Sequence, residues 1–146
     1  SRGVAFEQSK KWGLAEADFI KALELSPDQP FVMNYLGYAW TEQGINLTKA
    51  EKLIRKAANL RPKDGYITDS LGWILYQTAR FAEAVPILER AVRLRPNDAI
   101  INDHLGDAYW KVERHLDLQS YIRLPSSYFQ RGQKATPPLH CYSMWR

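Results

Sequence analysis

A period of about 34 residues runs through this chain and constrains its fold more than any other feature. Glycines at positions 3, 37, 72 and 106 are spaced by 34, 35 and 34 residues. A Gly on a contact face lets two helices approach closely, while a bulky neighbour such as Leu71 fills the gap beside it. The glycines therefore predict a repeated unit that packs mainly on its own neighbours. Three further series keep the same phase: Ala15, Ala50 and Ala84; Ala22, Ala57 and Ala91; and Pro27, Pro62 and Pro96.

One complete unit lies between residues 65 and 98. Its apolar residues fall on two stripes with the i, i+3, i+4 spacing of amphipathic helices. The gap at residues 78–80 has room only for a turn, and Pro96 stops the second helix, after which Asn97 or Asp98 is available to cap the next one. The unit is therefore predicted to be a helical hairpin. The stripes are Ile67, Leu71, Ile74, Leu75 and Thr78, followed by Phe81, Ala84, Val85, Leu88, Ala91 and Val92.

In length and in the register of its small residues, this unit resembles the tetratricopeptide repeat (TPR), a helix–turn–helix of the same period. The resemblance covers roughly residues 1–112, and the segments YLGYAW, DSLGWILY and NDHLGDAYW are similar to those of bacterial TPR proteins. It implies an all-α fold, a right-handed α-α superhelix of about three and a half TPR hairpins with an irregular C-terminal tail. It also implies a module for protein–protein interaction, a scaffold or adaptor.

The repeat phase divides the chain into five segments. Residues 1–29 are a partial first repeat, expected to hold a short helix over about 2–9 and a full helix over about 13–25. Residues 30–64 and 65–98 are complete repeats. In the first of these, Gly44 is expected to end a helix and Asn46 to cap the next. Pro86 lies near the start of a helix, where we expect at most a mild distortion.

The fourth repeat, 99–124, is degenerate. Ile101, Leu105, Ala108, Tyr109 and Val112 form its first buried stripe. Leu118 then stands where a small residue is due, and Pro125 where the next Ala is due. We expect a separate capping helix from about residue 115 to 123, and an irregular basic tail over 125–146. Whether that tail is native repeat sequence is left open.

Charge, cysteine content and termini say little about the cellular compartment or the binding partner. The net charge of +4 lies entirely after residue 110, where six Lys or Arg face two Asp or Glu. The lone Cys141 excludes a disulfide framework within the chain. No apolar run approaches the length of a membrane span. The chain opens inside a repeat and without Met, so we expect a fragment of a longer protein, and the compartment, bacterial cytoplasm or periplasm, stays open.

The sequence contains none of the motifs that carry catalysis. There is no Gly-rich phosphate loop, CxxC pair, HExxH or Ser elbow. His104 and Asp107 have a metal-compatible i, i+3 spacing, but two ligands without a third are more often a solvated pair, and His140-Cys141 is no stronger. The sequence therefore predicts a protein that is not an enzyme and holds no cofactor or metal.

In TPR folds the first helix of each repeat lines a concave groove, so binding residues are sought opposite the buried stripes. Aromatic rings there have a second explanation, packing between adjacent repeats, which we expect for Trp40 and Tyr109. Tyr38 and Trp73 recur on the opposite face and are expected to meet a ligand. The predicted peptide-binding groove consists of Asn34, Tyr35, Tyr38, Asp69, Ser70, Trp73, Asp103, His104 and Asp107. Phe31, Tyr66, Ile100 and Glu42 lie on the same face.

The resemblance also bears on the ligand. TPR domains that bind a C-terminal carboxylate use Lys or Arg and Asn on this face, whereas only Asn34 fits that pattern here. Carboxylates at positions 42, 69, 103 and 107 would repel a terminal carboxylate. We therefore expect a basic or aromatic peptide as partner.

Two alternatives to peptide binding remain. Nucleic acid could bind the basic tail through Tyr121, Tyr128 and Phe129, which steep salt dependence would reveal. Self-assembly could proceed through the solenoid ends, or through residues 121–134 docking in a groove, with Arg123 and Arg131 meeting its carboxylates.

Overall fold

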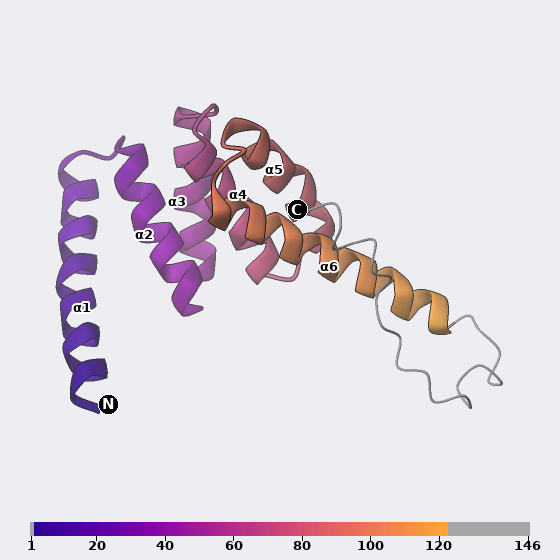
Figure 1. The fold of residues 1–146 in the computed structure, drawn as a ribbon. Helices are drawn as coiled ribbons and strands as arrows, with labels where there is room; N and C mark the ends of the chain where they lie inside the picture. The colour runs from indigo at the N-terminus through magenta and orange to yellow at the C-terminus, as the bar shows by residue number, and fades with distance from the viewer. Residues whose placement is uncertain (1, 123–146) are drawn as a thin grey trace. The chain divides into compact units, whose positions relative to one another are not determined.

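The computed structural model describes the backbone of residues 2–122 and the side chains of residues 8–113. This part of the chain is all-α, with no strand (Figure 1). The chain divides into two units, residues 1–114 and 115–146, and every contact below lies within the first. The helices are α1 (Arg2–Leu25), α2 (Pro30–Gln43), α3 (Leu47–Leu60), α4 (Gly65–Gln77), α5 (Phe81–Leu94) and α6 (Ala99–Ile122).

Two helical hairpins, α2–α3 and α4–α5, form the centre of the first unit, and their turns depend on left-handed backbone. Gly44 ends α2 at φ 67°, as the sequence predicts, and Ala79 turns the second hairpin at φ 60°. Asn46 stands at the predicted cap position but makes no side-chain cap bond. Its φ of 47° shows a different role, because Asn tolerates left-handed backbone better than most residues.

Two helices that follow a Pro-containing loop, α4 and α6, begin at an Asp whose carboxylate caps them, and Asp98 is one of the two residues predicted to cap α6. The Asp64 carboxylate accepts hydrogen bonds from the backbone N–H groups of Tyr66 (2.9 Å) and Ile67 (3.1 Å). The Asp98 carboxylate accepts one from the N–H of Ile101 at 3.1 Å. These bonds satisfy donors that a helix start leaves unpaired, so each cap sets where an inner helix begins. Pro86 lies inside α5, which continues past it to Leu94.

Small residues place the two helices of each hairpin in contact. A Cβ on Gly37 would lie 2.7 Å from Ile54 Cγ1, and one on Gly72 would lie 2.5 Å from Leu88 Cδ2. The alanines of both series are fully buried in α3 and α5. Glycine is therefore required at these two positions by close helix approach, and the predicted register is confirmed for both hairpins.

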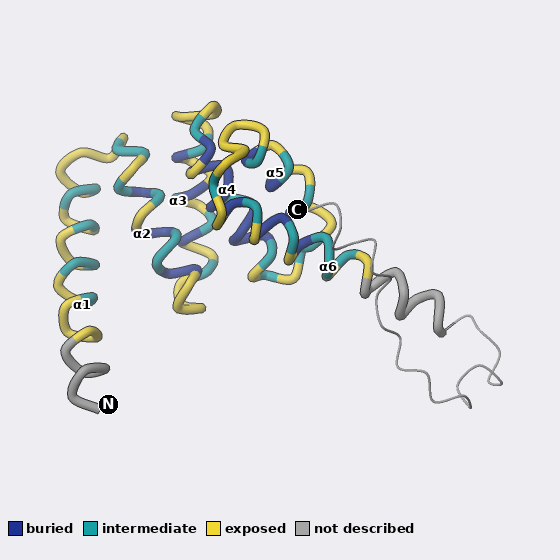
Figure 2. The backbone as a smooth tube through the Cα atoms, viewed as in Figure 1, coloured by how far each residue is buried: buried dark blue, intermediate teal, exposed yellow. Residues whose placement is uncertain are grey.

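The hydrophobic core follows the hairpins from one repeat to the next. One cluster joins α2, α3 and α4 through Leu36, Ile54 and Ile74, and another joins α4, α5 and α6 through Leu75, Leu88 and Leu105. Figure 2 shows buried positions in α2 to α6 and none among the described residues of α1. The first unit is thus an all-α helical-repeat superhelix in which each hairpin is buried by its neighbours.

Two predicted helix breaks are wrong. Residues 2–25 form one continuous helix instead of two, and α6 runs unbroken through the point where a separate capping helix was expected to start near residue 115. A non-glycine residue in left-handed backbone at a helix–helix turn costs roughly 1–2 kcal/mol of folding free energy. Packing of the second helix of the hairpin against the first offsets this cost. At Gly72, Leu88 provides that packing, whereas a Cβ on Gly13 or Gly106 would meet no atom within 4 Å. The predicted repeat boundaries themselves remain predictions.

Candidate binding groove

The inner helices α2 and α4 and the start of α6 enclose a groove with a cavity volume of about 370 Å³. Each helix contributes residues from its first turns, because the caps start α4 and α6 at corresponding points of successive repeats. The lining consists of Phe31, Asn34, Tyr35, Tyr38, Asp64, Tyr66, Ile67, Asp69, Ser70, Asp98, Ile100 and Ile101.

Large apolar side chains stand exposed around this groove. Tyr35 and Ile100 are 64% and 61% exposed, and the rings of Phe31 and Tyr66 are about half exposed. Phe31, Tyr66 and Ile100 occupy the same position in three successive inner helices. Tyr35 also stacks on Phe19 of α1, with ring centroids 6.5 Å apart. The groove therefore presents apolar surface that the described part of the chain leaves uncovered.

Asn34, which lines this groove, has an unsatisfied hydrogen-bond acceptor. Its side-chain oxygen is buried and has no hydrogen-bond partner among the described residues. Leaving a buried polar atom unpaired costs about 1–3 kcal/mol, so it marks a place where a donor from outside the chain would be favoured.

Two arginines lie beside the groove's aromatic rings. The Arg61 guanidinium lies over the Phe31 ring at 5.2 Å, and that of Arg95 lies over Tyr66 at 3.9 Å while donating to the Tyr66 hydroxyl at 2.7 Å. Both precede the prolines that end the outer helices, one period apart. The sequence analysis did not assign these arginines to the groove, although the Arg-Pro pair recurs one period apart and could have indicated them.

Asp69, Trp73 and His104 form a buried cluster. Nδ1 of His104 lies 2.9 Å from one Asp69 carboxylate oxygen and 3.0 Å from the other. The His104 ring stacks on Trp73 with centroids 3.9 Å apart, and Tyr76 stacks on Trp73 at 4.7 Å. The Trp73 Nε1–H donates to Glu42 at 2.5 Å. This cluster ties α2, α4 and α6 together.

Tyr38 joins this cluster to the groove. Burial, followed by the nearby charges of Glu42 and Asp69, raises the pKa of Tyr38 to about 12. An ordinary Tyr pKa of about 10 already keeps the phenol protonated at neutral pH, and the raised pKa extends this into the alkaline range. Its hydroxyl is hydrogen-bonded to Glu42, and Tyr38 also lines the groove.

The structure separates the nine predicted residues into two groups. Asn34, Tyr35, Tyr38, Asp69 and Ser70 line the groove, whereas Trp73, Asp103, His104 and Asp107 do not. Trp73 and His104 are buried between repeats, so the packing explanation holds for Trp73 as it does for the buried Trp40. The lining also includes Asp64, which the sequence analysis did not consider, and Ile67, Asp98 and Ile101, which it assigned to buried stripes or to a cap.

The predicted acidic character of the groove changes accordingly. Asp69 is held by His104, Glu42 accepts from Trp73, and Asp103 and Asp107 lie outside the lining. Asp64 and Asp98 supply the remaining carboxylates. His104 is bonded to Asp69, and no group of three or more potential metal ligands occurs among the described residues. No helix in the described part of the chain is long and apolar enough to cross a membrane.

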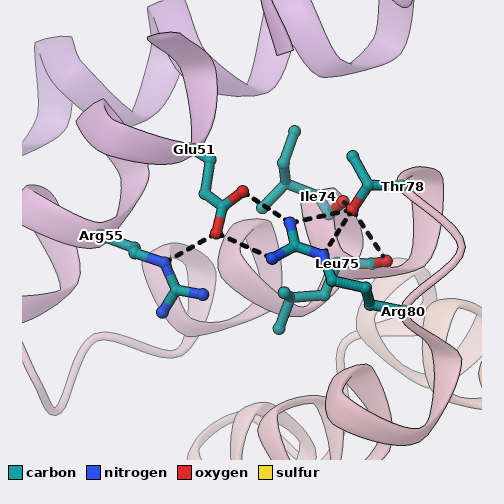
Figure 3. A network of polar contacts seen from close by, with 6 residues as sticks. All are labelled: Glu51, Arg55, Ile74, Leu75, Thr78 and Arg80. Atoms are coloured by element: carbon teal, nitrogen blue, oxygen red, sulfur yellow. Dashed lines mark hydrogen bonds and ion pairs between the residues drawn. The ribbon is translucent and has the colours of Figure 1, made fainter. Parts of the chain in front are cut away.

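A polar network away from the groove locks the hairpins together (Figure 3). Arg80, in the α4–α5 turn, donates through Nη1 (3.1 Å) and Nη2 (2.5 Å) to the two carboxylate oxygens of Glu51 on α3. Arg55 donates to Glu51 at 2.8 Å, and Arg80 also donates to the Thr78 hydroxyl at 3.1 Å. Such a bidentate contact fixes orientation as well as distance, so the network sets how one hairpin sits on the next.

The repeat register and helical hairpins are matched by a known family. Residues 70–98 match the family model described as tetratricopeptide repeat. These residues form a tetratricopeptide repeat (TPR). It is 32% identical over 84 residues to a TPR repeat-containing protein of Pseudomonas aeruginosa, which covers 58% of this chain. The chain spans 14% of the length of that relative. This bacterial relative agrees with the bacterial origin expected from the sequence.

Solved structures of TPR proteins share the fold. The Sgt2 TPR domain from Aspergillus fumigatus is similar with a TM-score of 0.66 at 18% identity, over 96% of this chain and 89% of that one. MamA is similar with a TM-score of 0.63 at 23% identity, over 83% and 71%. An O-GlcNAc transferase of Thermobaculum terrenum is similar with a TM-score of 0.60 at 27% identity, over 64% of this chain but only 18% of the transferase. The TPR fold is a general protein–protein interaction module.

Proposed function

We propose that this TPR chain binds an extended peptide segment of a partner protein in the groove formed by α2, α4 and the start of α6. The observation that carries the proposal is the buried, unpartnered side-chain oxygen of Asn34, which lies among the exposed rings of Phe31, Tyr35 and Tyr66. A peptide backbone N–H would satisfy this oxygen, while its side chains would cover the rings.

An aromatic or large aliphatic side chain is the favoured anchor. Tyr35 and Ile100 are more than half exposed, and covering such surface is the main source of binding energy at small interfaces. Tyr38 adds a neutral hydroxyl beside the anchor. We therefore expect specificity for an apolar residue next to a free backbone N–H.

A Lys or Arg in the peptide would complement the carboxylates of Asp64 and Asp98. Each carboxylate caps a helix through one oxygen and keeps its negative charge at the edge of the lining. Arg61 and Arg95 lie over the neighbouring rings and limit how strongly a basic peptide is favoured. The proposed ligand is thus an aromatic segment with one or two basic residues.

Selection from a displayed library of random peptides of about nine residues, roughly 30 Å when extended, tests the proposal. The selected peptides are expected to be enriched in aromatic residues with Lys or Arg nearby. Tyr35→Ala and Asn34→Leu should each weaken their binding about ten-fold or more. Asn34→Leu should not lower the melting temperature, because it removes an unpaired buried oxygen while keeping the shape.

Leu60→Ala is the matched control, because this exposed side chain lies outside the groove lining. It should leave peptide affinity unchanged. Selected peptides that bind the Tyr35 and Asn34 variants as tightly as the original chain would refute the proposal. The nucleic-acid and tail-docking alternatives depend on side chains beyond residue 113, outside the described residues.

A further inference from the structure

We propose a second docking site on the opposite face of α2, for an amphipathic helix that carries acidic residues beside its apolar stripe. Leu36 and Trp40 contribute to this second groove, whereas Asn34, Tyr35 and Tyr38 contribute to the first. At 100° per residue, the two sets point to opposite sides of the helix. The second groove is therefore a separate surface.

The second groove has apolar walls and two outer helices as its sides. Ile20 and Leu23 come from α1 and Leu53 from α3, with Leu36 and Trp40 of α2 buried between them. Its cavity volume is about 400 Å³, and Ile20 is 40% exposed. Two flanking helices with an apolar floor are the geometry into which a third helix fits by its apolar stripe.

The corresponding surface of the next repeat, beside α3 and α5, carries polar contacts in place of exposed aliphatic side chains. One period after Ile20 stands Arg55, which donates to Glu51, and Arg80 bonds the same carboxylate (Figure 3). Arg90 of α5 also donates to the carbonyl oxygen of Pro62 at 2.5 Å. These charged side chains are bonded within the chain, whereas Ile20, Leu23 and Leu53 line the second groove with aliphatic surface.

Charge identifies the partner. Lys49 and Lys52, one turn apart on the α3 wall, form no ion pair among the described residues, whereas Lys56 on the next turn is paired with Asp28 at 3.1 Å. Glu24 lies on the α1 wall. A partner helix would place Asp or Glu against the two lysines. The chain's own tail after residue 124 carries Arg131, Lys134 and Arg146 and no acidic residue, so it does not suit this wall.

Two peptide probes of about 14 residues test the assignment. Both carry Leu at i, i+3, i+4 and i+7, and one has Glu where the other has Lys on the flanking positions. Calorimetry should show the Glu peptide binding the full chain about ten-fold or more tightly than the Lys peptide, with amide shifts confined to α1, α2 and α3. Lys49→Glu and Lys52→Glu should each weaken the Glu peptide about two- to five-fold and strengthen the Lys peptide.

Ile20→Glu should weaken the Glu peptide further, since it places a charge on the apolar wall. Lys63→Glu, an equal charge change in an exposed loop, and Tyr35→Ala, in the first groove, should leave this binding unchanged. Failure of the Glu peptide to bind, equal affinity for both peptides, or loss of binding in Tyr35→Ala would each overturn the assignment. So would a dimer, seen by light scattering, that Ile20→Glu dissociates, because a second copy would then occupy the groove.

Discussion

Gly72 shows how a single absent Cβ sets the distance between two helices. A Cβ there would lie 2.5 Å from both Cγ and Cδ2 of Leu88, a fully buried side chain with little room to move. Gly65 is also crowded, because a Cβ would lie 2.6 Å from Arg95 Cγ. It is therefore not the open helix start that its sequence position suggests.

We predict opposite effects for two Gly→Ala changes. Gly72→Ala should lower the free energy of unfolding by about 1–3 kcal/mol through overpacking. Gly13→Ala should raise it by up to about 1 kcal/mol, because Gly13 is exposed inside α1 and Ala favours helix. Urea titrations of both variants measure the difference, and equal losses would contradict the packing of α4 on α5.

Trp73 and Tyr35 separate a packed ring from an exposed one. Trp73→Ala should lower the free energy of unfolding by about 3 kcal/mol or more, because its ring is stacked between His104 and Tyr76. Tyr35→Ala should change it by only about 0.5 kcal/mol, since that ring is mostly exposed. Thermal melts distinguish the two, and a small effect of Trp73→Ala would restore Trp73 as a ligand-facing residue.

At the scale of elements, Glu51 couples α3 to the turn between α4 and α5. Hydrogen bonding from Arg80 is the largest cause that lowers the pKa of Glu51; partial burial opposes it, and Arg55 lowers it further. A lowered folded-state pKa means that the charged form stabilises the fold above the unfolded pKa of about 4.3. This contribution disappears as the pH falls through the lower, folded-state value.

We therefore predict that Glu51→Gln destabilises the chain at pH 7 and that the difference from the original chain shrinks below about pH 4. Because Glu51, Arg55 and Arg80 are partly exposed to solvent, we expect Glu51→Gln to lower the free energy of unfolding at pH 7 by only roughly 1 kcal/mol. Urea unfolding between neutral and acid pH measures this trend. A difference that stays constant across that range would show that the charge of Glu51 does not carry the coupling.

At the scale of the whole molecule, the basic tail and the groove lose much of their expected complementarity. Asp69 is bonded to His104, and Asp103 and Asp107 lie outside the lining. We therefore expect deletion of residues 125–146, a segment outside the described residues, to leave the mass in light scattering unchanged. A dimer that disappears on deletion would instead support docking of the tail in a neighbouring molecule.

The sequence by itself determined the helical hairpin, its period and its register. These properties are local or repeat at a fixed interval: the caps at Asp64 and Asp98, the turn at Gly44 and the glycine at position 72 all act within one unit or on the next helix. Because the unit repeats every 34 residues, the same cap, turn and contact residues recur several times in one sequence. The hairpin and its register can therefore be predicted from a single chain. The all-α repeat fold and the TPR family were predicted for this reason.

Only the tertiary structure decided which inward residues line the groove and which are buried beneath it. Trp73 and Tyr35 both lie on inner helices, but His104 from the next repeat stacks on Trp73 at 3.9 Å and buries it, whereas the more distant stacking of Phe19 on Tyr35 leaves that side chain 64% exposed. Tertiary packing also decided that α1 and α6 are continuous. A turn forms only where the second helix of a hairpin packs on the first and offsets the backbone strain of the turn. Periodicity gives the direction of a side chain, whereas exposure depends on which side chains the neighbouring repeats bring against it.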